Sequence, residues 1–365
     1  MIADLREFLQ RHSEAVIGIL LQEPMYRNAV NACCSHAINI TQETYQSIKE
    51  QINTHGVQVV ISEKQFIPLL NILQWDCSSL HTYLTVDCAN PLEYPEPKKG
   101  LLMSRRLWDF TAMNAKDEYE GGGWVDSYNR CKFSQQEMEE FADNVLQKLQ
   151  PSLNSNAKVL EIGCSSGLTM FKIAPLVGEY HAVDLSRVMI ERNRVNAEKK
   201  GLSSVYLYNL AADEIDRLQQ TDFDIIIMNS VIQCFPGYNY LRKVIRKCIG
   251  IMSESGTIFL GDVMDLELKD DLIASIKLHK QLYPEANAKL DNSAETYYAK
   301  NFFVDLQSEF PEIARVCCNS KHHTIVNELT QFRYDVQLFV DKKGKSLIPP
   351  KKKAQHGIDI REEII

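Results

Sequence analysis

Several common sequence signatures are missing from this chain of 365 residues. Its ten cysteines include no CxxC pair, which argues against a zinc ribbon or a thioredoxin-type redox site. No apolar run approaches the ~18 residues of a membrane span. No basic region precedes the short run AVIGILL near the start, so a signal peptide is not expected either. These absences favour a protein of the cytoplasm with reduced cysteines and no membrane partner.

A surplus of basic residues is also missing. Lys and Arg number 40 against 48 Asp and Glu, so the formal net charge is −8. A dedicated nucleic-acid binder would carry the opposite balance to neutralise phosphates, and no nucleic-acid partner is expected. Hydrophobic residues make up 45% and charged residues 24%, which is typical of a globular protein. The length predicts two domains or one large one.

Composition and helical periodicity suggest four regions. The segment DLREFLQRHSEAVIGILL has apolar residues near helical spacing, although HGVQVVISEKQF could be a strand or a helix edge. A proline-rich break follows at residues 89–100, and SQQEMEEFADNVLQKL is a predicted helix that Ser134 caps. The predicted organisation is a mainly helical accessory domain at 1–95, lid or linker helices at 96–150, a ligand-binding domain at 151–345 and a polar tail at 346–365.

The third region alternates short apolar runs with helical stretches. This alternation predicts βαβ units and a mostly parallel sheet. The helix SRVMIERNRVNAEKKG between two such runs begins after Ser186 and ends at Gly201. The seven predicted strands are KVLEIG, YHAVDL, VYLYNL, FDIIIMNS, GTIFLGDV, ARVCCNSK and FRYDVQLFVDKK.

A glycine-containing turn follows the first of these strands, in KVLEIGCSSGLTMFKIA. Small residues at Gly163, Ser165 and Gly167 let the backbone approach a ligand. The turn lacks a GKS or GKT ending, so a phosphate-binding P-loop is not expected, and its spacing does not fit the GxGxxG of dinucleotide sites. A glycine turn of this kind also occurs in α/β proteins that bind no nucleotide.

Two acids follow the next predicted strands. Asp184 comes 21 residues after Gly163, where an acid holds the ribose hydroxyls of an adenosine ligand. Asp213, in LAADE, is placed at the end of the third strand, where a carboxylate can accept from an adenine amino group. Each acid alone could be a helix cap or a surface residue. Together with the turn they predict an adenosine-containing cofactor, and both NAD and S-adenosylmethionine fit this geometry.

The turn EIGCSSG resembles motif I of class I methyltransferases. Longer segments resemble the S-adenosylmethionine-dependent methyltransferases embedded in, or associated with, polyketide synthases and nonribosomal peptide synthetases. The similarity runs from about residue 104 to 341, and its most specific parts are MNSVIQCFPGYNYL and NELTQFRYDVQLFV. It implies a Rossmann-like fold with a seven-stranded, mostly parallel sheet and an antiparallel end strand. It also implies S-adenosylmethionine as cofactor.

The resemblance assigns roles around that cofactor. Asn229 would face the sulfonium, and Tyr128 would belong to a lid, although Tyr128 and Trp124 could equally be an ordinary packed aromatic pair. Gln233 and Phe235 would line the acceptor pocket together with Trp124. The residues implied to hold the cofactor are Glu161, Gly163, Ser165, Gly167, Asp184, Asp213 and Asn229.

The catalytic assignment depends on the acceptor, because a hydroxyl needs a base within hydrogen-bond reach. Glu328 is the favoured base or base-orienting group, beside Asn327. Similar sequences carry a histidine before that asparagine, whereas Val326 stands here, so His323 is a second candidate for the base. No metal-ligand spacing is present.

The expected activity is O-methylation of a polyketide- or peptide-type intermediate in specialised metabolism. The acceptor could be a free small molecule or one tethered to an acyl or peptidyl carrier protein, which would then be a partner. Carbon or nitrogen methylation, an inactive scaffold with the methyltransferase fold and an NAD-dependent oxidoreductase are the alternatives.

Overall fold

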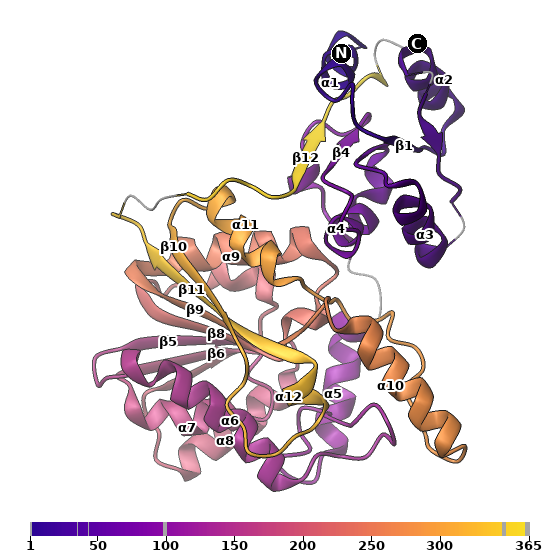
Figure 1. Cartoon of the computed structure of the whole chain (residues 1–365). Helices are drawn as coiled ribbons and strands as arrows, with labels where there is room; N and C mark the ends of the chain where they lie inside the picture. Colours follow the sequence, from indigo (N-terminus) through magenta and orange to yellow (C-terminus); the bar gives the residue numbers. More distant parts are fainter. Residues whose placement is uncertain (1, 35, 43, 98–100, 345–347, 362–365) are drawn as a thin grey trace. The chain divides into compact units, whose positions relative to one another are not determined.

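A computed structural model describes residues 2–34, 36–42, 44–97, 101–344 and 348–361. The chain divides into two compact units (Figure 1). The first comprises Met1–Pro97, Gly237–Tyr240 and Pro349–Ile365, and the second comprises Lys98–Pro236 and Leu241–Ile348. Across the described ranges, no helix has both the length and the apolar character needed to cross a bilayer.

The first unit contains a five-stranded parallel sheet with the strand order β12-β4-β3-β1-β2. Alternate residues of its central strands pack on opposite faces, so Ile19 joins a core with α1 and α2, and Leu20 joins a core with α3 and α4. The strands are β1 (Ile17–Leu20), β2 (Ile38–Asn39), β3 (Val59–Ser62), β4 (Thr82–Thr85) and β12 (Ala354–Gly357). The helices are α1 (Ile2–Arg11), α2 (Pro24–Cys33), α3 (Tyr45–His55), α4 (Ile67–Asp76), η1 (Lys64–Phe66) and η2 (Pro91–Glu93).

The region 1–95, which is expected to be mainly helical, does contain more helix than strand, but the expectation missed the parallel sheet at its core, which makes it an α/β region. The segments IGIL, VVIS and TYLT are buried at every position. A strand that is covered on both faces shows no alternation of apolar and polar residues, so its pattern resembles that of a buried helix. The open assignment of HGVQVVISEKQF resolves as a strand, β3.

The expectation of a polar tail at 346–365 is also wrong for the described part of that segment. Residues Ala354–Gly357 form β12, which pairs in parallel with β4. Ile360, just beyond this strand, is fully buried in the core of the first unit. The segment AQHG is polar and gains its structure from a partner strand about 270 residues earlier, so nothing local in the sequence indicates it.

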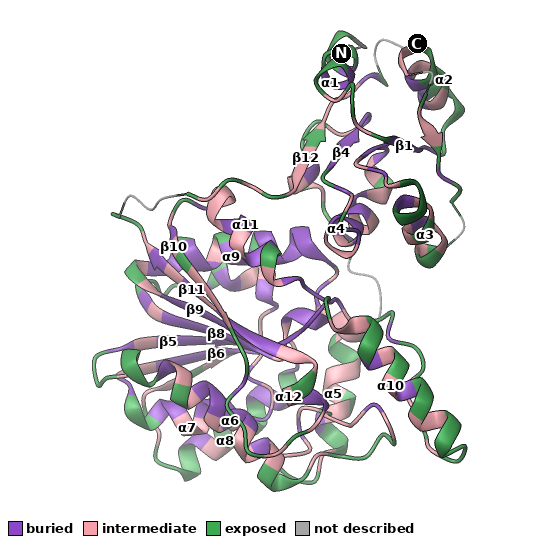
Figure 2. Cartoon of the chain, viewed as in Figure 1, coloured by how far each residue is buried: buried purple, intermediate pink, exposed green. Residues whose placement is uncertain are grey.

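The second unit contains the predicted seven-stranded Rossmann-like sheet, with the order β10-β11-β9-β8-β5-β6-β7. The antiparallel member is β11, which lies between β9 and the edge strand β10. All seven predicted segments form strands: β5 (Lys158–Ile162), β6 (Glu179–Val183), β7 (Val205–Tyr208), β8 (Phe223–Asn229), β9 (Met252–Met264), β10 (Ile313–Asn319) and β11 (Arg333–Asp341). Figure 2 shows the central strands of this sheet as largely buried.

Helices cover both faces of this sheet, with α6, α7 and α8 on one face and α9 and α11 on the other (Figure 1). The predicted capping box of α6 is present, because Ser134 accepts from the Glu137 N–H and the Glu137 side chain accepts from the Ser134 N–H. The α-helices are α5 (Arg105–Asn114), α6 (Gln135–Leu149), α7 (Leu168–Ile173), α8 (Arg187–Lys199), α9 (Tyr238–Ile251), α10 (Lys269–Leu282), α11 (Lys300–Glu309) and α12 (Glu328–Gln331). The 3₁₀ helices are η3 (Leu101–Met103), η4 (Gln150–Ser152), η5 (Ala174–Leu176), η6 (Ala212–Arg217) and η7 (Ile232–Cys234).

Candidate active site

The loop between β5 and α7 is built on three residues with left-handed backbone. Gly163 has φ 78°, Ser165 has φ 46° and Gly167 has φ 84°. A Cβ on Gly163 would lie 2.5 Å from the Val231 side chain, so glycine is required there by space as well as by conformation. Ser165 adopts the same region at a cost that glycine would avoid. The result is a loop that presents backbone, with little side chain, at the carboxyl ends of β5 and β8.

Asp184 directly follows β6 and holds this loop in place. Its carboxylate accepts from the Ser165 N–H at 2.8 Å and from the Ser186 N–H at 2.7 Å. The residue is only 8% exposed, and burial raises the pKa of its carboxyl group to about 6, against the lowering effect of these two hydrogen bonds. Each oxygen keeps a second lone pair that a ligand hydroxyl could use. The position therefore fits the predicted ribose contact and adds a structural role.

Glu161 lies within β5, two residues before Gly163. It is 3% exposed and accepts a hydrogen bond from the Tyr180 hydroxyl at 2.9 Å. Burial raises the pKa of Glu161 to about 8, so much of the population carries a neutral carboxyl group at pH 7. The role of Glu161 in holding the cofactor stays a prediction.

Asp213 does not lie at the end of the third strand, and that expected position is wrong. Strand β7 ends at Tyr208, and Asp213 lies five residues further, in η6. Its carboxylate forms an ion pair with Lys243 at 3.2 Å. The strand prediction VYLYNL extended past the true end, which moved the acid closer to the strand than it is. A contact of Asp213 with adenine stays a prediction.

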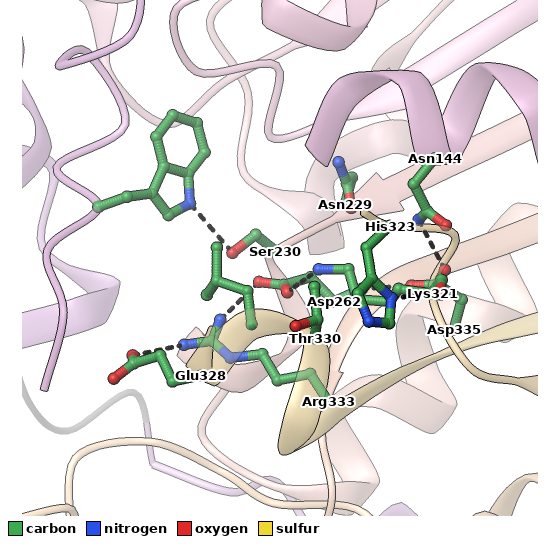
Figure 3. Close-up of polar contacts among 12 residues, drawn as sticks. Asn144, Asn229, Ser230, Asp262, Lys321, His323, Glu328, Thr330, Arg333 and Asp335 are labelled. Atoms are coloured by element: carbon green, nitrogen blue, oxygen red, sulfur yellow. Dashed lines mark hydrogen bonds and ion pairs between the residues drawn. The ribbon is translucent and has the colours of Figure 1, made fainter. Parts of the chain in front are cut away.

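The carboxyl end of β8 brings polar side chains beside the glycine turn. Asn229, 7% exposed, donates to the Thr169 hydroxyl at 3.4 Å. The next residue, Ser230, has φ 59°, and its Oγ accepts from Trp124 Nε1 at 3.3 Å and from Gln233 Nε2 at 2.9 Å. Figure 3 draws a dashed contact to the Ser230 hydroxyl and labels Asn229 in the same view. Trp124, placed by sequence in the acceptor pocket, thus reaches the end of β8.

The segment 115–134, between α5 and α6, is here called the covering segment. A Cβ on Gly121 would lie 2.4 Å from the Ser166 Cβ, so the backbone at Gly121 packs closely on the loop at 163–167, here called the cofactor loop. Further along, the backbone N–H and hydroxyl of Ser127 donate to Glu328 at 2.7 and 3.2 Å. The Tyr128 hydroxyl lies 2.9 Å from Ser275 Oγ on α10. These contacts are those that a lid over the carboxyl ends of the strands would make.

A buried ionic cluster lies beneath this segment, and the sequence did not reveal it. Asp262, fully buried and with φ 60°, lies between Lys321 and Arg333, with 2.5 Å to each (Figure 3). Burial alone would raise the pKa of Asp262, but the two cations lower it to about 2. The Asp262 backbone N–H donates to Asp335, which also accepts from Asn144. The cluster ties β9, β11 and the 320–323 segment together.

The predicted base Glu328 is part of this cluster. It begins α12, is 6% exposed, and lies 3.7 Å from Arg333 as well as against Ser127 (Figure 3). Both of its carboxylate oxygens already have partners in the protein. This geometry gives Glu328 a positioning role between the covering segment and β11. Its action as a base stays a prediction.

The other predicted catalytic residues have separate partners. Asn327 caps α12 through the Leu329 N–H and donates to Glu137 at 2.9 Å. His323 is exposed, and its Nδ1 lies 2.9 Å from the Lys321 carbonyl oxygen. Tyr128 contacts α10, where its ring and that of His279 form a T-shaped pair with 5.4 Å between the ring centroids. Glu328, His323 and Tyr128 thus contact three different parts of the unit and do not form a triad.

The predicted pocket residues Gln233 and Phe235 follow β8 and are buried, at 8% and 4% exposure. Thr296 holds this segment, because its N–H donates to the Gln233 carbonyl at 2.9 Å and its hydroxyl donates to the Phe235 carbonyl at 2.8 Å. No motif in the sequence marks residues 289–296. The structure places them against the predicted acceptor pocket.

The seven-stranded sheet and the glycine turn define a Rossmann-like methyltransferase fold, and comparisons with known proteins agree. A family model described as a methyltransferase domain matches residues 153–327. The chain is 34% identical over 227 residues to the chondramide synthase cmdD of Chondromyces crocatus, covering 60% of this chain and 6% of that protein. It is 27% identical over 225 residues to the enniatin synthase of Fusarium equiseti, covering 58% of this chain and 7% of that protein. The chain thus spans a small fraction of these relatives.

Among solved structures, a methyltransferase of Aquifex aeolicus described as SAM-dependent is similar at 15% identity and a TM-score of 0.38, over 57% of this chain and 94% of that one. From the family model and the relatives, this chain contains a class I S-adenosylmethionine-dependent methyltransferase domain, related to methyltransferase domains embedded in nonribosomal peptide synthetases. The predicted family, enzyme class and cofactor are confirmed.

The residues present fit S-adenosylmethionine. The left-handed turn at Gly163, Ser165 and Gly167 keeps side chains out of the loop. Ser166 Oγ is buried there and has no hydrogen-bond partner among the described residues, which suits a polar ligand. Asp184 and Asn229 add an acid and an amide at the ends of β6 and β8, the strands on either side of β5.

Proposed function

We propose that this methyltransferase methylates a hydroxyl oxygen of a peptide- or polyketide-type intermediate in specialised metabolism, with the acceptor free or tethered to a carrier protein. The observation that carries the proposal is the continuous cover that the covering segment makes over the cofactor loop, the end of β8 and α12. The names of the relatives support the class of acceptor, because one is described as a chondramide synthase and the other as an enniatin synthase.

Bound S-adenosylmethionine supplies a methyl group on a positively charged sulfur. The chain's own residues then orient the acceptor and exclude water, which is the main way an enzyme accelerates a displacement. Asp184 would hold the ribose, the loop at 163–167 would cradle the methionine part, and Asn229 would face the sulfonium. Trp124 and Ser127 would fix the covering segment above the acceptor through Ser230 and Glu328.

Nitrogen methylation is the second candidate, and one observation favours it. A hydroxyl acceptor benefits from a base, but Glu328 is already held by Ser127 and Arg333, and His323 is exposed. An unprotonated amine needs no such base. The oxygen candidate therefore requires a residue near the acceptor to act as a base, whereas the nitrogen candidate does not.

Two matched acceptors separate these candidates. The N-acetylcysteamine thioesters of L-lactate and L-alanine have the same shape and carry a hydroxyl or an amine at the same carbon. We expect calorimetric binding of S-adenosylhomocysteine to the wild type, its loss in Asp184→Ala, and methyl transfer to the lactate thioester. Transfer to the alanine thioester alone would establish the nitrogen candidate, and absence of cofactor binding would contradict both. The same acceptors loaded on a purified carrier protein would test that partner by a rise in kcat/KM.

A further inference from the structure

Four buried polar atoms near the predicted acceptor pocket have no hydrogen-bond partner among the described residues. They are Gln233 Oε1, Asn292 Nδ2, Asn292 Oδ1 and Glu295 Oε2. Gln233 is 8% exposed and Asn292 is 7% exposed, so water at the surface does not satisfy these side chains. A buried polar atom without a partner costs free energy, and such atoms gather where a ligand supplies the missing bonds.

Backbone hydrogen bonds hold the 289–296 segment, which carries Asn292 and Glu295, against the residues that follow β8. The Thr296 N–H donates to the Gln233 carbonyl at 2.9 Å, and Glu295 is the residue directly before Thr296. Burial, and next the charge of Glu295, raise the pKa of the Cys234 thiol to about 12, which agrees with Glu295 facing that residue. At the other end of the segment the Lys289 N–H donates to the Ser127 carbonyl at 2.8 Å. The segment therefore joins the covering segment to the end of β8.

Only one of the two carboxylate oxygens of Glu295 has a partner among the described residues. Glu295 Oε1 forms an ion pair with Lys289. Gln233 is fixed in the same way, because its Nε2 donates to Ser230 Oγ at 2.9 Å while Oε1 has no partner. These anchors orient the unpartnered atoms without satisfying them.

We propose that Gln233, Asn292 and Glu295 bind an amide group of the methyl acceptor. The three side chains offer three acceptor atoms and one amide nitrogen as donor, so the matching ligand brings N–H hydrogens beside a carbonyl oxygen. A secondary amide has one N–H and one carbonyl oxygen, so it pairs with one of the three acceptor atoms and with the Asn292 amide nitrogen. It could belong to the peptide part of the acceptor or to the pantetheine arm of a carrier protein. The inference rests on the proposed function, because it assigns this cluster to that reaction's acceptor.

A stability measurement tests the cluster without any ligand. Asn292→Leu removes two unpartnered atoms, and we expect the melting temperature of the second unit to rise by ~2–4 °C. Asn144 is the matched control, since it is 1% exposed but its amide donates to Asp335 and accepts from the His322 N–H. Asn144→Leu should lower the melting temperature by ~4 °C or more. Destabilisation by Asn292→Leu similar to that of the control would overturn the proposal.

Direct binding then tests the amide. With S-adenosylhomocysteine saturating, three probes are titrated: N-acetyl-L-serine methyl ester, pantetheine, and methyl 3-hydroxypropanoate, which has the hydroxyl without an amide. We expect at least one amide probe to bind ~10-fold or more tightly than the hydroxyl ester, and which one binds identifies the source of the amide.

Asn292→Leu and, as a second variant, Glu295→Gln should reduce this preference and leave S-adenosylhomocysteine binding unchanged. If neither amide probe binds the wild type at millimolar concentration, or if both variants keep the full preference, the cluster does not bind an amide. Loss of S-adenosylhomocysteine binding by the wild type is a different result and contradicts the proposed function itself.

Discussion

Asp262→Asn tests whether the buried ionic cluster supports the second unit. The substitution removes the negative charge between Lys321 and Arg333, whose side chains are 2% and 14% exposed. Two buried cations would then face a neutral amide. Breaking a buried ion pair by removing one partner costs about 3–5 kcal/mol, because the remaining charge is left without compensation. We expect this loss of unfolding free energy at pH 7.

The pKa of Asp262 determines how the difference in unfolding free energy between the wild type and Asp262→Asn changes with pH. The cations lower the pKa of Asp262 from the ordinary value of 3.8 to about 2. A carboxyl group whose pKa is lowered by folding stabilises the protein above its unfolded value, and this contribution is lost as the pH falls through the folded value. The difference corresponds to about 2 kcal/mol. The gap between the wild type and Asp262→Asn should therefore narrow by that amount between pH 5 and pH 2.

Urea unfolding, followed by tryptophan fluorescence, measures the difference in unfolding free energy between the wild type and Asp262→Asn. The chain has three tryptophans, and in a Trp75→Phe background only Trp108 and Trp124 remain, both in the second unit. Lys243→Met is the control, because its ion pair with Asp213 is formed by a lysine side chain that is 55% exposed, and exposed pairs contribute about 0–1 kcal/mol. A loss below about 1 kcal/mol in Asp262→Asn, or a gap that does not change with pH, would refute the reasoning.

Three further predictions concern the cofactor site and its cover. Ser165→Gly should keep S-adenosylhomocysteine affinity within ~2-fold, because φ 46° suits glycine, whereas Gly163→Ala should weaken it ~10-fold or more through a 2.5 Å clash; calorimetry on both tests this. Asp184→Asn should lower the affinity ~10–100-fold, and wild-type affinity should fall as the pH drops through about 6, where the carboxylate is protonated; a flat profile would contradict the ribose role. Glu328→Gln should make amide exchange at Ser127 ~10–100-fold faster, and unchanged protection would show that this contact does not hold the covering segment.

The second unit could be predicted in detail because its signals are local. Its central strands are buried on both faces and appear as continuous apolar runs, such as FDIIIMNS, between helices with recognisable ends. The capping box from Ser134 to Glu137 spans only four residues and is present as expected. The turn at Gly163 and the acid Asp184 are also present where the sequence predicts them, because each directly follows an apolar strand, β5 and β6.

The parts that could not be predicted depend on contacts between distant residues. Asp262 meets Lys321 and Arg333 across 59 and 71 residues, so no spacing in the sequence indicates the cluster. The motif NELTQFRYDV favours Glu328 as a base, but its partner Ser127 lies 201 residues earlier and gives it a different environment. Asn292 is in a segment without regular structure, where only burial and the lack of partners mark it.

The pairing of β12 with β4 has a consequence for synthesis on the ribosome. The whole second unit is inserted between these two neighbouring strands of the first unit. At roughly 5–20 residues per second, β4 waits on the order of ten seconds or more before β12 emerges. During that time one edge of β4 presents unpaired N–H and C=O groups, which can recruit another chain. A chain stalled or cut before Ala354 would keep this edge open, so completion of a short polar strand protects the first unit from aggregation.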